Sequence, residues 1–123
     1  MGMSIELENR FHKFGKDVRD FCLRCKKDIL NMEYIRQVVR SSGSFGANYI
    51  EAVENLGKAD ERMKLKISRK EARETTHWLD YILTNGDEEL EKERLKIVDE
   101  SSQITGILSN IIIKVENRNK STP

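Results

Sequence analysis

Proline and long apolar runs are what this chain of 123 residues most clearly lacks. Its one proline is Pro123, the last residue, so nothing forces a helix to break earlier in the chain. No run approaches the roughly 18 apolar residues that a membrane-spanning helix needs, and the longest purely aliphatic run covers residues 111–113. The first ten residues include two glutamates and an arginine, which leaves no core for a secretory signal. We therefore expect a cytoplasmic protein that does not have a membrane as its partner.

The chain also has no large net charge and no recognisable catalytic motif. The formal net charge is +1, which provides no global electrostatic argument for nucleic acid as a partner. The chain shows no nucleophile–base–acid triad, phosphate-binding glycine loop or dinucleotide fingerprint. The segment 41–46 contains two glycines, but it follows no strand. We therefore expect a protein that is not an enzyme and holds no cofactor.

The two cysteines and two histidines do not predict a reactive or metal-binding site. Cys22 and Cys25 form a Cys-x-x-Cys pair late in a predicted helix and on its apolar stripe. A redox pair would instead lie at a helix N-terminus, where the dipole lowers the thiol pKa. His12 and His77 have no spacing that would complete a zinc site with these thiols. We expect two thiols in the core of a protein from a reducing compartment.

Glu74 and His77 form a Glu-x-x-His pair, which carboxylate-bridged di-metal bundles take from each of two helices. The second pair is missing, because its nearest analogue, residues 100–103, ends in glutamine. Glu51 could add one carboxylate, but the first predicted helix offers none on its apolar stripe. We expect no metal site, and we expect His77 to be a surface residue beside Trp78.

Residues that favour helices are plentiful, and the alternation of β-branched residues that is typical of strands is absent. Apolar residues recur instead at spacings of three and four, which places them on one side of a helix. This pattern predicts four helices of similar length, at about 5–29, 32–56, 61–84 and 88–117. Equal helices with short polar connections fold most simply as an up-down-up-down antiparallel bundle. We therefore expect an all-α four-helix bundle, with residues 1–123 as a single domain.

The predicted core follows the apolar stripes of these helices. In the first helix the stripe is Phe11, Phe14, Val18, Phe21, Cys22, Cys25 and Ile29. In the second it is Ile35, Val38, Val39, Ser42, Phe45 or Gly46, Tyr49, Val53 and Leu56. In the fourth it is Leu90, Val98, Ser101, Thr105, Leu108, Ile112 and Val115.

Caps and glycines mark the helix ends. The predicted N-terminal caps are Asn31 and Asp60, and the predicted C-terminal residues are Gly57 and Asn85–Gly86. Gly43 and Gly46 lie inside the second helix, where each costs roughly 1 kcal/mol relative to alanine. We expect that another helix approaches closely there. The alternative is a break at residues 41–44, which would give five helices.

The third predicted helix carries two apolar stripes. One consists of Met63, Ile67, Glu71 or Glu74, Trp78 and Ile82, and the other of Leu65, Ala72, Leu79 and Leu83. The fourth helix is also widened, by Ile97, Ile104, Ile107 and Ile111. A helix within one bundle needs a single stripe, so the second stripe predicts an interface between subunits. We therefore expect a homo-oligomer whose interface contains Leu65, Ala72, Leu79 and Leu83.

Charged residues interrupt the first stripe of the third helix. A buried charge there costs heavily unless it is paired. Arg40 and Glu51 are eleven residues, or three helical turns, apart and therefore share a face of the second helix. We expect a polar layer that fixes the register of the helices, and a ligand or partner pocket is the alternative. The members of this layer are Arg40, Asn48, Glu51, Glu71 and Glu74.

Charge is segregated along the chain although its total is near zero. Between Lys58 and Arg73, seven basic residues outnumber three acidic ones, which leaves +4, whereas residues 87–100 hold seven acidic and three basic residues, which leaves −4. A basic helix face of this kind can bind a phosphate backbone without sequence preference, and an ordinary solvated face is the alternative. The candidate nucleic-acid-binding residues are Lys58, Arg62, Lys66, Arg69, Lys70 and Arg73.

Two segments resemble a known family. Residues 40–52 read Arg-Ser-Ser-Gly-Ser-Phe-Gly-Ala-Asn-Tyr-Ile-Glu-Ala, and residues 64–79 read Lys-Leu-Lys-Ile-Ser-Arg-Lys-Glu-Ala-Arg-Glu-Thr-Thr-His-Trp-Leu. Together they resemble the bacterial four-helix-bundle proteins encoded by intervening sequences of 23S ribosomal RNA genes, over nearly the whole chain. Phe45 stands where the family more often has isoleucine. The matching positions are Arg40, Ser44, Ala47, Asn48, Glu51, Lys64, Leu65, Glu71, Ala72, Glu74, Thr75, Trp78 and Leu79.

The resemblance implies an up-down bundle that assembles as a ring-shaped homopentamer, and it assigns no catalytic residues to the chain. A related branch, the accessory proteins of diversity-generating retroelements, binds reverse transcriptase and nucleic acid through a basic surface. We therefore predict a non-catalytic, oligomeric bundle that binds RNA, or an enzyme acting on nucleic acid such as a reverse transcriptase, through the basic face. The alternative is a structural protein–protein interaction module with no affinity for nucleic acid.

Overall fold

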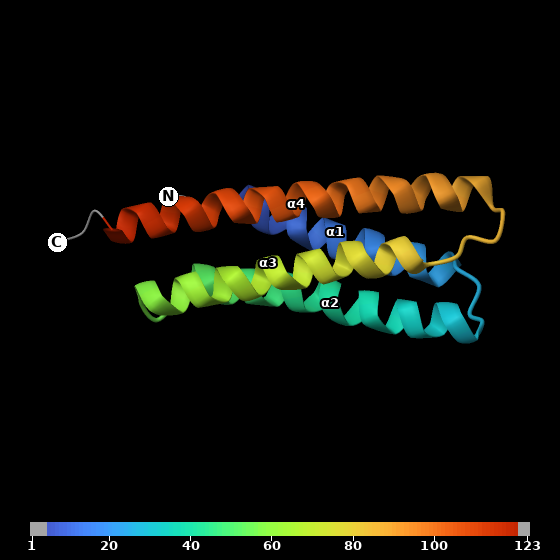
Figure 1. The fold of residues 1–123 in the computed structure, drawn as a ribbon, viewed down its shortest axis with the longest axis horizontal. Coiled ribbons are helices and arrows are strands. Elements are labelled where there is room, and N and C mark those ends of the chain that lie inside the picture. Colours follow the sequence, from blue (N-terminus) through green and yellow to red (C-terminus); the bar gives the residue numbers. More distant parts are fainter. Residues whose placement is uncertain (1–4, 121–123) are drawn as a thin grey trace.

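The computed structural model describes the backbone of residues 5–120 and the side chains of residues 5–118. This part of the chain forms four helices and no strand: α1 (Ile5–Arg24), α2 (Ile29–Val53), α3 (Lys58–Tyr81) and α4 (Glu88–Lys120). Consecutive helices run in opposite directions (Figure 1). α1 and α3 each pack against both α2 and α4, which closes the bundle. The predicted all-α, up-down-up-down fold is confirmed.

The core of the bundle lies along the apolar stripes that face its axis. The fully buried side chains include Val18 and Phe21 of α1, Phe45 of α2 and Leu108 of α4. The Phe45 ring lies 5.2 Å from the ring of Phe11, measured between centroids. Each such side chain stabilises the fold by roughly 1.5–3 kcal/mol through apolar burial. None of the described helices combines the length and the apolar character that crossing a membrane would require.

The connection between α1 and α2 differs from the prediction. The Asp28 carboxylate accepts the backbone N–H of Asn31 at 2.9 Å and so caps α2, which begins three residues earlier than expected. α1 ends at Arg24, and the Lys27 ammonium donates to carbonyl oxygens of its last turn. Ile29, which we placed on the buried stripe, therefore lies at the start of α2 and is 88% exposed.

Asn31, released from the predicted capping role, is fully buried and ties two connections together. Its Nδ2 donates to the carbonyl oxygens of Lys26 at 3.0 Å and of Leu83 at 2.9 Å. Its Oδ1 accepts the backbone N–H of Leu83 at 2.9 Å. A single amide thus satisfies three backbone groups at the end of the bundle where α1 passes into α2 and α3 ends.

The bounds of α2 and α3 also shift by three residues at the opposite end of the bundle. Gly57 has a positive φ of 143° and directly precedes α3, so it is not the C-terminal residue of α2. Asp60 lies inside the first turn, where its carboxylate accepts the N–H of Leu56 at 3.1 Å. Leu56 is 96% exposed and Val53 is 40% exposed. The prediction that these two residues belong to the core is therefore wrong.

The connection between α3 and α4 begins earlier than predicted. α3 ends at Tyr81, and Ile82 is already extended. Asn85 and Gly86 form the following turn with positive φ values of 54° and 81°. The Asp87 carboxylate accepts the N–H of Leu90 at 3.0 Å at the start of α4.

α2 is continuous through residues 41–44, so the alternative with five helices is wrong. Hydroxyl groups mediate its contact with α3. Ser41 and Thr75 share a hydrogen bond of 2.8 Å, and Ser68 donates to the carbonyl oxygen of Phe45 at 2.7 Å. These small side chains allow the two helices to approach closely. A close approach of another helix to α2 therefore exists, but it lies on the side of α2 that carries Ser41 and not at Gly43 and Gly46.

Candidate nucleic-acid interface

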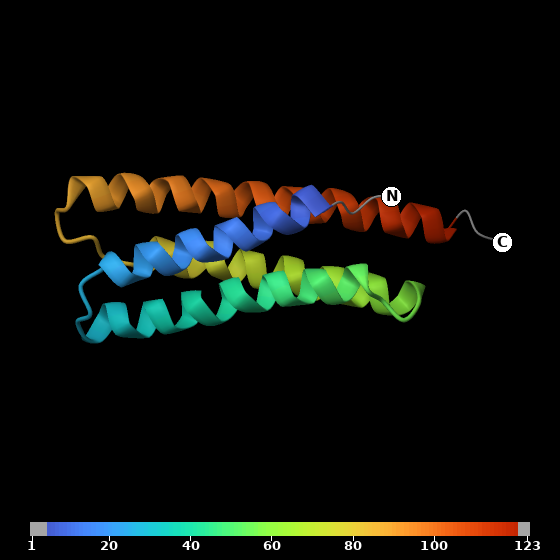
Figure 2. The same cartoon turned by 180° about the vertical axis from the view of Figure 1, so that it is seen from behind.

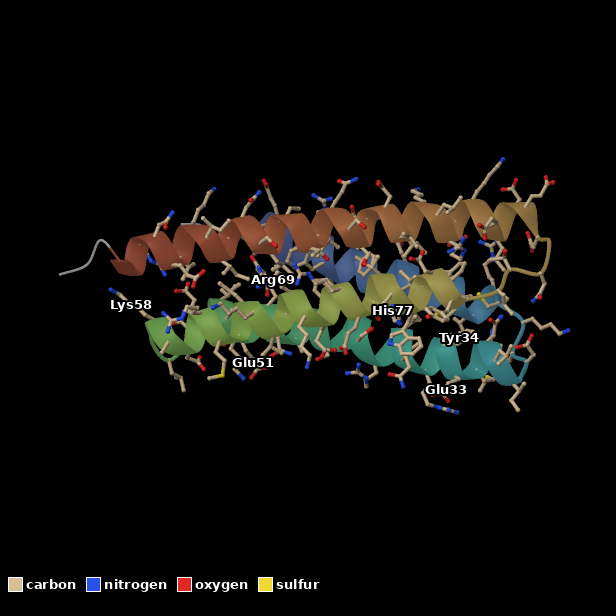
Figure 3. All side chains as sticks on the ribbon, viewed as in Figure 1. Glu33, Tyr34, Glu51, Lys58, Arg69 and His77 are labelled. Carbon is tan, nitrogen blue, oxygen red and sulfur yellow. The ribbon has the colours of Figure 1, made fainter. Side chains whose placement is uncertain are left out.

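The basic residues predicted to bind nucleic acid lie along α3 as the prediction requires. Arg62, Lys70 and Arg73 recur at helical spacings on the side of α3 that faces solvent, where Lys70 and Arg73 are exposed and Arg62 is half-buried. Figure 3 shows Lys58 near the start of α3 and Arg69 further along, between α3 and α4. We call the six predicted residues of α3 the basic face: Lys58, Arg62, Lys66, Arg69, Lys70 and Arg73.

Two members of the basic face also contact α4. The Lys66 ammonium lies 3.4 Å from the Glu116 carboxylate, and Arg69 donates to the Ser109 hydroxyl at 3.5 Å. Within residues 5–118, by contrast, Arg62, Lys70 and Arg73 form no ion pair or side-chain hydrogen bond. The cationic groups on the outer part of the face are therefore available to an anion.

The predicted polar layer is smaller than expected. Arg40 pairs with Glu71 at 3.1 Å and with Glu74 at 3.3 Å, and these contacts join α2 to α3. The pKa of Arg40 is raised, chiefly by the hydrogen bond to Glu74. Glu71 is buried, so its charge is stabilised by this pairing.

The other two predicted members of the layer lie elsewhere. Glu51 pairs with Lys64 at 3.2 Å, three helical turns along α2 from Arg40. Asn48 donates to the carbonyl oxygen of Ser44 within its own helix at 2.9 Å. The prediction of one five-residue layer is therefore wrong, because the ion pairs of Arg40 and of Glu51 lie at different heights of the bundle and Asn48 bonds within α2.

A group of four aromatic rings that the sequence did not predict, two of them exposed and two half-buried, lies on α2 and α3. Tyr34 of α2 stacks on Trp78 with 6.2 Å between ring centroids, and His77 and Tyr81 lie 4.9 Å apart. Figure 3 shows Tyr34 of α2 beside His77 of α3. We call these four residues the aromatic cluster. The spacing of residues 77, 78 and 81 predicts adjacency on one helix, but the contribution of α2 required the tertiary structure.

A groove opens between α1 and α2 because α1 diverges from α2 toward its own N-terminus (Figure 2). Its volume is about 830 Å³. Gly43 and Gly46 line it, and a Cβ atom built on either would meet nothing within 4 Å. The expectation of a close helix at these glycines is therefore wrong. Val39, which we also placed in the core, lines the same groove and is 50% exposed.

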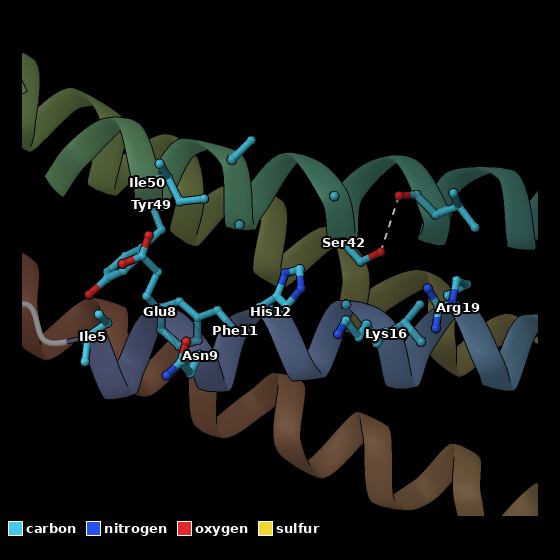
Figure 4. Close-up of a pocket in the computed structure, with 16 residues that line it drawn as sticks. Ile5, Glu8, Asn9, Phe11, His12, Lys16, Arg19, Ser42, Tyr49 and Ile50 are labelled. Carbon is cyan, nitrogen blue, oxygen red and sulfur yellow. Dashed lines mark hydrogen bonds between the residues drawn. The ribbon is translucent and has the colours of Figure 1, made fainter. Parts of the chain in front are cut away.

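Tyr49 projects from α2 into this groove beside Glu8 of α1 (Figure 4). Its ring contacts Phe11 edge-on at 4.7 Å, and the side chain is fully buried. Its hydroxyl has no hydrogen-bond partner among the described residues. Burial, with a further contribution from the Glu8 charge, raises the pKa of Tyr49 to about 12.

The stripe predicted as an interface between subunits lies mostly inside the bundle. Leu65 and Leu79 are 0% exposed and Ala72 is 1% exposed, so these side chains have no surface to offer a second subunit. The assignment is wrong at these three positions, because α2 and α4 both pack against α3 and this stripe is buried within one chain. Leu83, which is 43% exposed, remains accessible.

The thiols lie in the core as predicted. Cys22 and Cys25 are buried and unpaired, and Cys25 donates to the carbonyl oxygen of Phe21 at 3.3 Å. Burial raises the pKa of Cys22 to about 12, which keeps the thiol protonated and unreactive. His77 is a surface residue beside Trp78, as expected. Among the described residues, no three His, Cys, Asp or Glu side chains are grouped so that they could hold a metal ion.

Comparison with known proteins defines the class. The family described as 23S rRNA-intervening sequence protein matches residues 4–110. The chain therefore belongs to this family. A crystal structure of a protein of unknown function from the S23 ribosomal protein family of Bacteroides thetaiotaomicron is similar to the chain, with a TM-score of 0.71 and 29% identity. The similarity covers 85% of this chain and 96% of that one. No curated protein matches the chain.

Proposed function

We propose that this protein is a non-catalytic bundle that binds RNA through the basic face of α3. The observation that carries the proposal is that Arg62, Lys70 and Arg73 point to solvent from one side of a helix and form no ion pair within the described residues. Cationic groups in such a row attract a phosphate backbone. The descriptions of the family and of the similar structure, which refer to 23S rRNA and to a ribosomal protein, support RNA as the ligand.

The acidic segment of α4 does not compete for these cations. Glu100 pairs with Arg10 of α1 at 2.7 Å, and Glu91 pairs with Arg94 at 2.6 Å. The hydrogen bond from Arg94 is the main cause that lowers the pKa of Glu91 to about 2. These two carboxylates are therefore paired within the chain and do not neutralise the basic face. The proposal places the protein in the cytoplasm, where RNA is present and its two unpaired thiols stay reduced.

The basic face is tested by reversing charges that contact no other helix. We expect Lys70→Glu with Arg73→Glu to weaken binding of a single-stranded RNA by on the order of 100-fold at low salt, about tenfold for each lost phosphate contact. The slope of log K against log salt concentration should fall by roughly 1.4. Filter binding or fluorescence anisotropy over a salt series measures both quantities.

The matched control is Lys96→Glu with Lys114→Glu, which changes the net charge equally at exposed positions of α4. It should retain most of the affinity. Lys66 and Arg69 are less suitable targets, since their reversal would also disturb the contact with α4. Equal losses in both double variants would mean that net charge, and not the basic face, governs binding. No binding of RNA by the unaltered protein would favour a module that binds protein only.

We also propose that copies of the chain associate through the groove between α1 and α2. Apolar side chains of α2 remain half-exposed along it, including Val39 at 50% and Ile50 at 45%. A helix from a second copy would cover this apolar surface. The ring-shaped pentamer that the family resemblance implies would have five times the mass of the 14.3 kDa chain.

Gly46→Leu tests this contact. In one chain the new side chain meets open space, and its higher helix propensity should stabilise α2 by up to about 1 kcal/mol. It would obstruct a second helix in the groove, so we expect a more stable chain that no longer associates. Analytical ultracentrifugation and urea unfolding measure the two effects.

The control is Gly106→Leu, which adds the same side chain to open space on α4. It should leave association unchanged. A Gly46→Leu protein that associates as the unaltered protein does would exclude the groove, and an unaltered protein that stays monomeric at high concentration would exclude self-association altogether.

A further inference from the structure

We infer that the aromatic cluster is a stacking site for unpaired bases, which would make single-stranded RNA, and not duplex RNA, the ligand of this surface. The inference rests on the proposed function and specifies the form of RNA that is bound. It combines two features of α3 that adjoin each other, since Arg73 of the basic face precedes His77 of the aromatic cluster by one helical turn. A strand whose phosphates lie on the basic face would bring its next bases to the rings.

The rings have both a fixed arrangement and free surface. Tyr34 and Trp78 are half-buried and pack against the core, which holds them in position. Tyr81 is 46% exposed and His77 is also exposed, so their ring faces can be reached from solvent. Trp78 lies 5.6 Å from Tyr81, measured between ring centroids. A base can therefore stack on the outer rings while the inner pair supports them.

The electrostatics around the cluster permit a polyanion to approach. Each acidic residue that adjoins the rings along its helix is paired with an arginine. Glu33 pairs with Arg36 at 3.2 Å, Glu74 with Arg40 at 3.3 Å and Asp80 with Arg94 at 3.7 Å. These pairs reduce the repulsion that a phosphate group would meet beside the rings.

Base stacking on protein rings distinguishes single-stranded RNA from duplex RNA as a ligand. In a duplex the bases are stacked on one another and only the edges and the backbone can be reached. Aromatic rings next to a basic track are the arrangement by which proteins bind single strands with little sequence preference. The basic face alone would bind both forms, so the aromatic cluster should provide a preference for the single strand.

Trp78 is the only tryptophan in the chain, so its fluorescence reports directly on this site. We expect an unstructured single-stranded RNA of twelve nucleotides to quench the emission on titration at low salt. A duplex RNA of the same length should bind without quenching. Tyr81→Ala should weaken single-strand binding by roughly tenfold or more and leave duplex binding unchanged, whereas Tyr81→Phe, which keeps the ring, should bind as the unaltered protein does. Circular dichroism confirms that each variant is folded.

Met63→Ala is the matched control, because it truncates an apolar side chain that is 57% exposed near the other end of α3. It should leave both affinities unchanged. Single-stranded RNA that binds without quenching Trp78, and that binds the Tyr81→Ala variant equally well, would overturn this inference. The proposed function would survive that result if Lys70→Glu with Arg73→Glu still weakened binding as expected above. Absence of RNA binding by the unaltered protein would overturn both.

Discussion

Replacing Leu79 by aspartate is expected to unfold the protein. Leu79 is 0% exposed between α3 and its neighbours, so the new carboxylate would be buried without a partner. Such a change costs more than about 4 kcal/mol, against a total stability of roughly 5–15 kcal/mol for a domain of ordinary size. We expect the helical circular dichroism signal and the cooperative unfolding transition to be largely lost at 37 °C.

The matched control is Leu83→Asp, because Leu83 is 43% exposed just beyond the end of α3. There the carboxylate remains hydrated, and the cost should stay below about 1 kcal/mol. If the Leu79→Asp protein kept its cooperative transition and only its mass in light scattering decreased, Leu79 would lie between subunits, and the packing described for α3 would be incorrect.

Asn31→Ala is expected to have the second largest effect, at about 2–4 kcal/mol. The substitution leaves three backbone groups without their partner, namely the carbonyl oxygen of Lys26 and both the N–H and the carbonyl oxygen of Leu83. Each unsatisfied group costs roughly 1 kcal/mol or more, since the Asn31 side chain that binds these groups is fully buried. Urea unfolding should show a lower midpoint with an unchanged slope.

Two variants sharpen this test. Asn110→Ala removes an exposed amide from α4 and should change stability by less than about 0.5 kcal/mol. Asn31→Asp keeps the acceptor for Leu83 but loses both donated hydrogen bonds and buries a charge, so it should be at least as harmful as Asn31→Ala. An Asn31→Ala protein as stable as the unaltered one would show that the two connections hold together without this amide.

The two proposals about function concern different sides of the molecule, so they can fail separately. RNA binding is assigned to the solvent side of α3, and association is assigned to the groove between α1 and α2. Lys70 and Arg73 are exposed on the first surface, and Gly46 lines the second. Substitutions on one surface should therefore not alter the other property directly. A ring of subunits would repeat the basic face and raise the affinity for a long strand through multivalency.

The candidate site was only partly predictable from the sequence. The basic face follows directly from helical spacing, since residues 62, 66, 69 and 73 fall on one side of any regular helix. The separate ion pairs of the predicted polar layer could not be predicted from the sequence. Which carboxylates reach Arg40 depends on how α2 and α3 pack against each other. The aromatic cluster was missed for the same reason, as Tyr34 and Trp78 are distant in sequence and meet only across two helices.

The error at the start of α2 has a tertiary cause. Asp28, Asn31 and Asp60 are all suitable caps by residue type, and the sequence does not show which of them will be needed elsewhere. Asn31 is required to hold the carbonyl oxygen of Lys26 and the backbone of Leu83, so Asp28 takes the cap and α2 begins earlier. The choice between equivalent caps was thus made by a contact between distant segments.

The sequence by itself determined the number, order and approximate length of the helices, and with them the class of fold. The reason is that apolar spacing and the absence of internal proline act within each helix and do not depend on its neighbours. Only the tertiary structure decided which apolar stripe is buried, which carboxylates are paired and where a groove opens. These properties depend on which helices become neighbours, as the burial of Leu65 and the exposure of Val39 show. That arrangement is set by the packing of all four helices together.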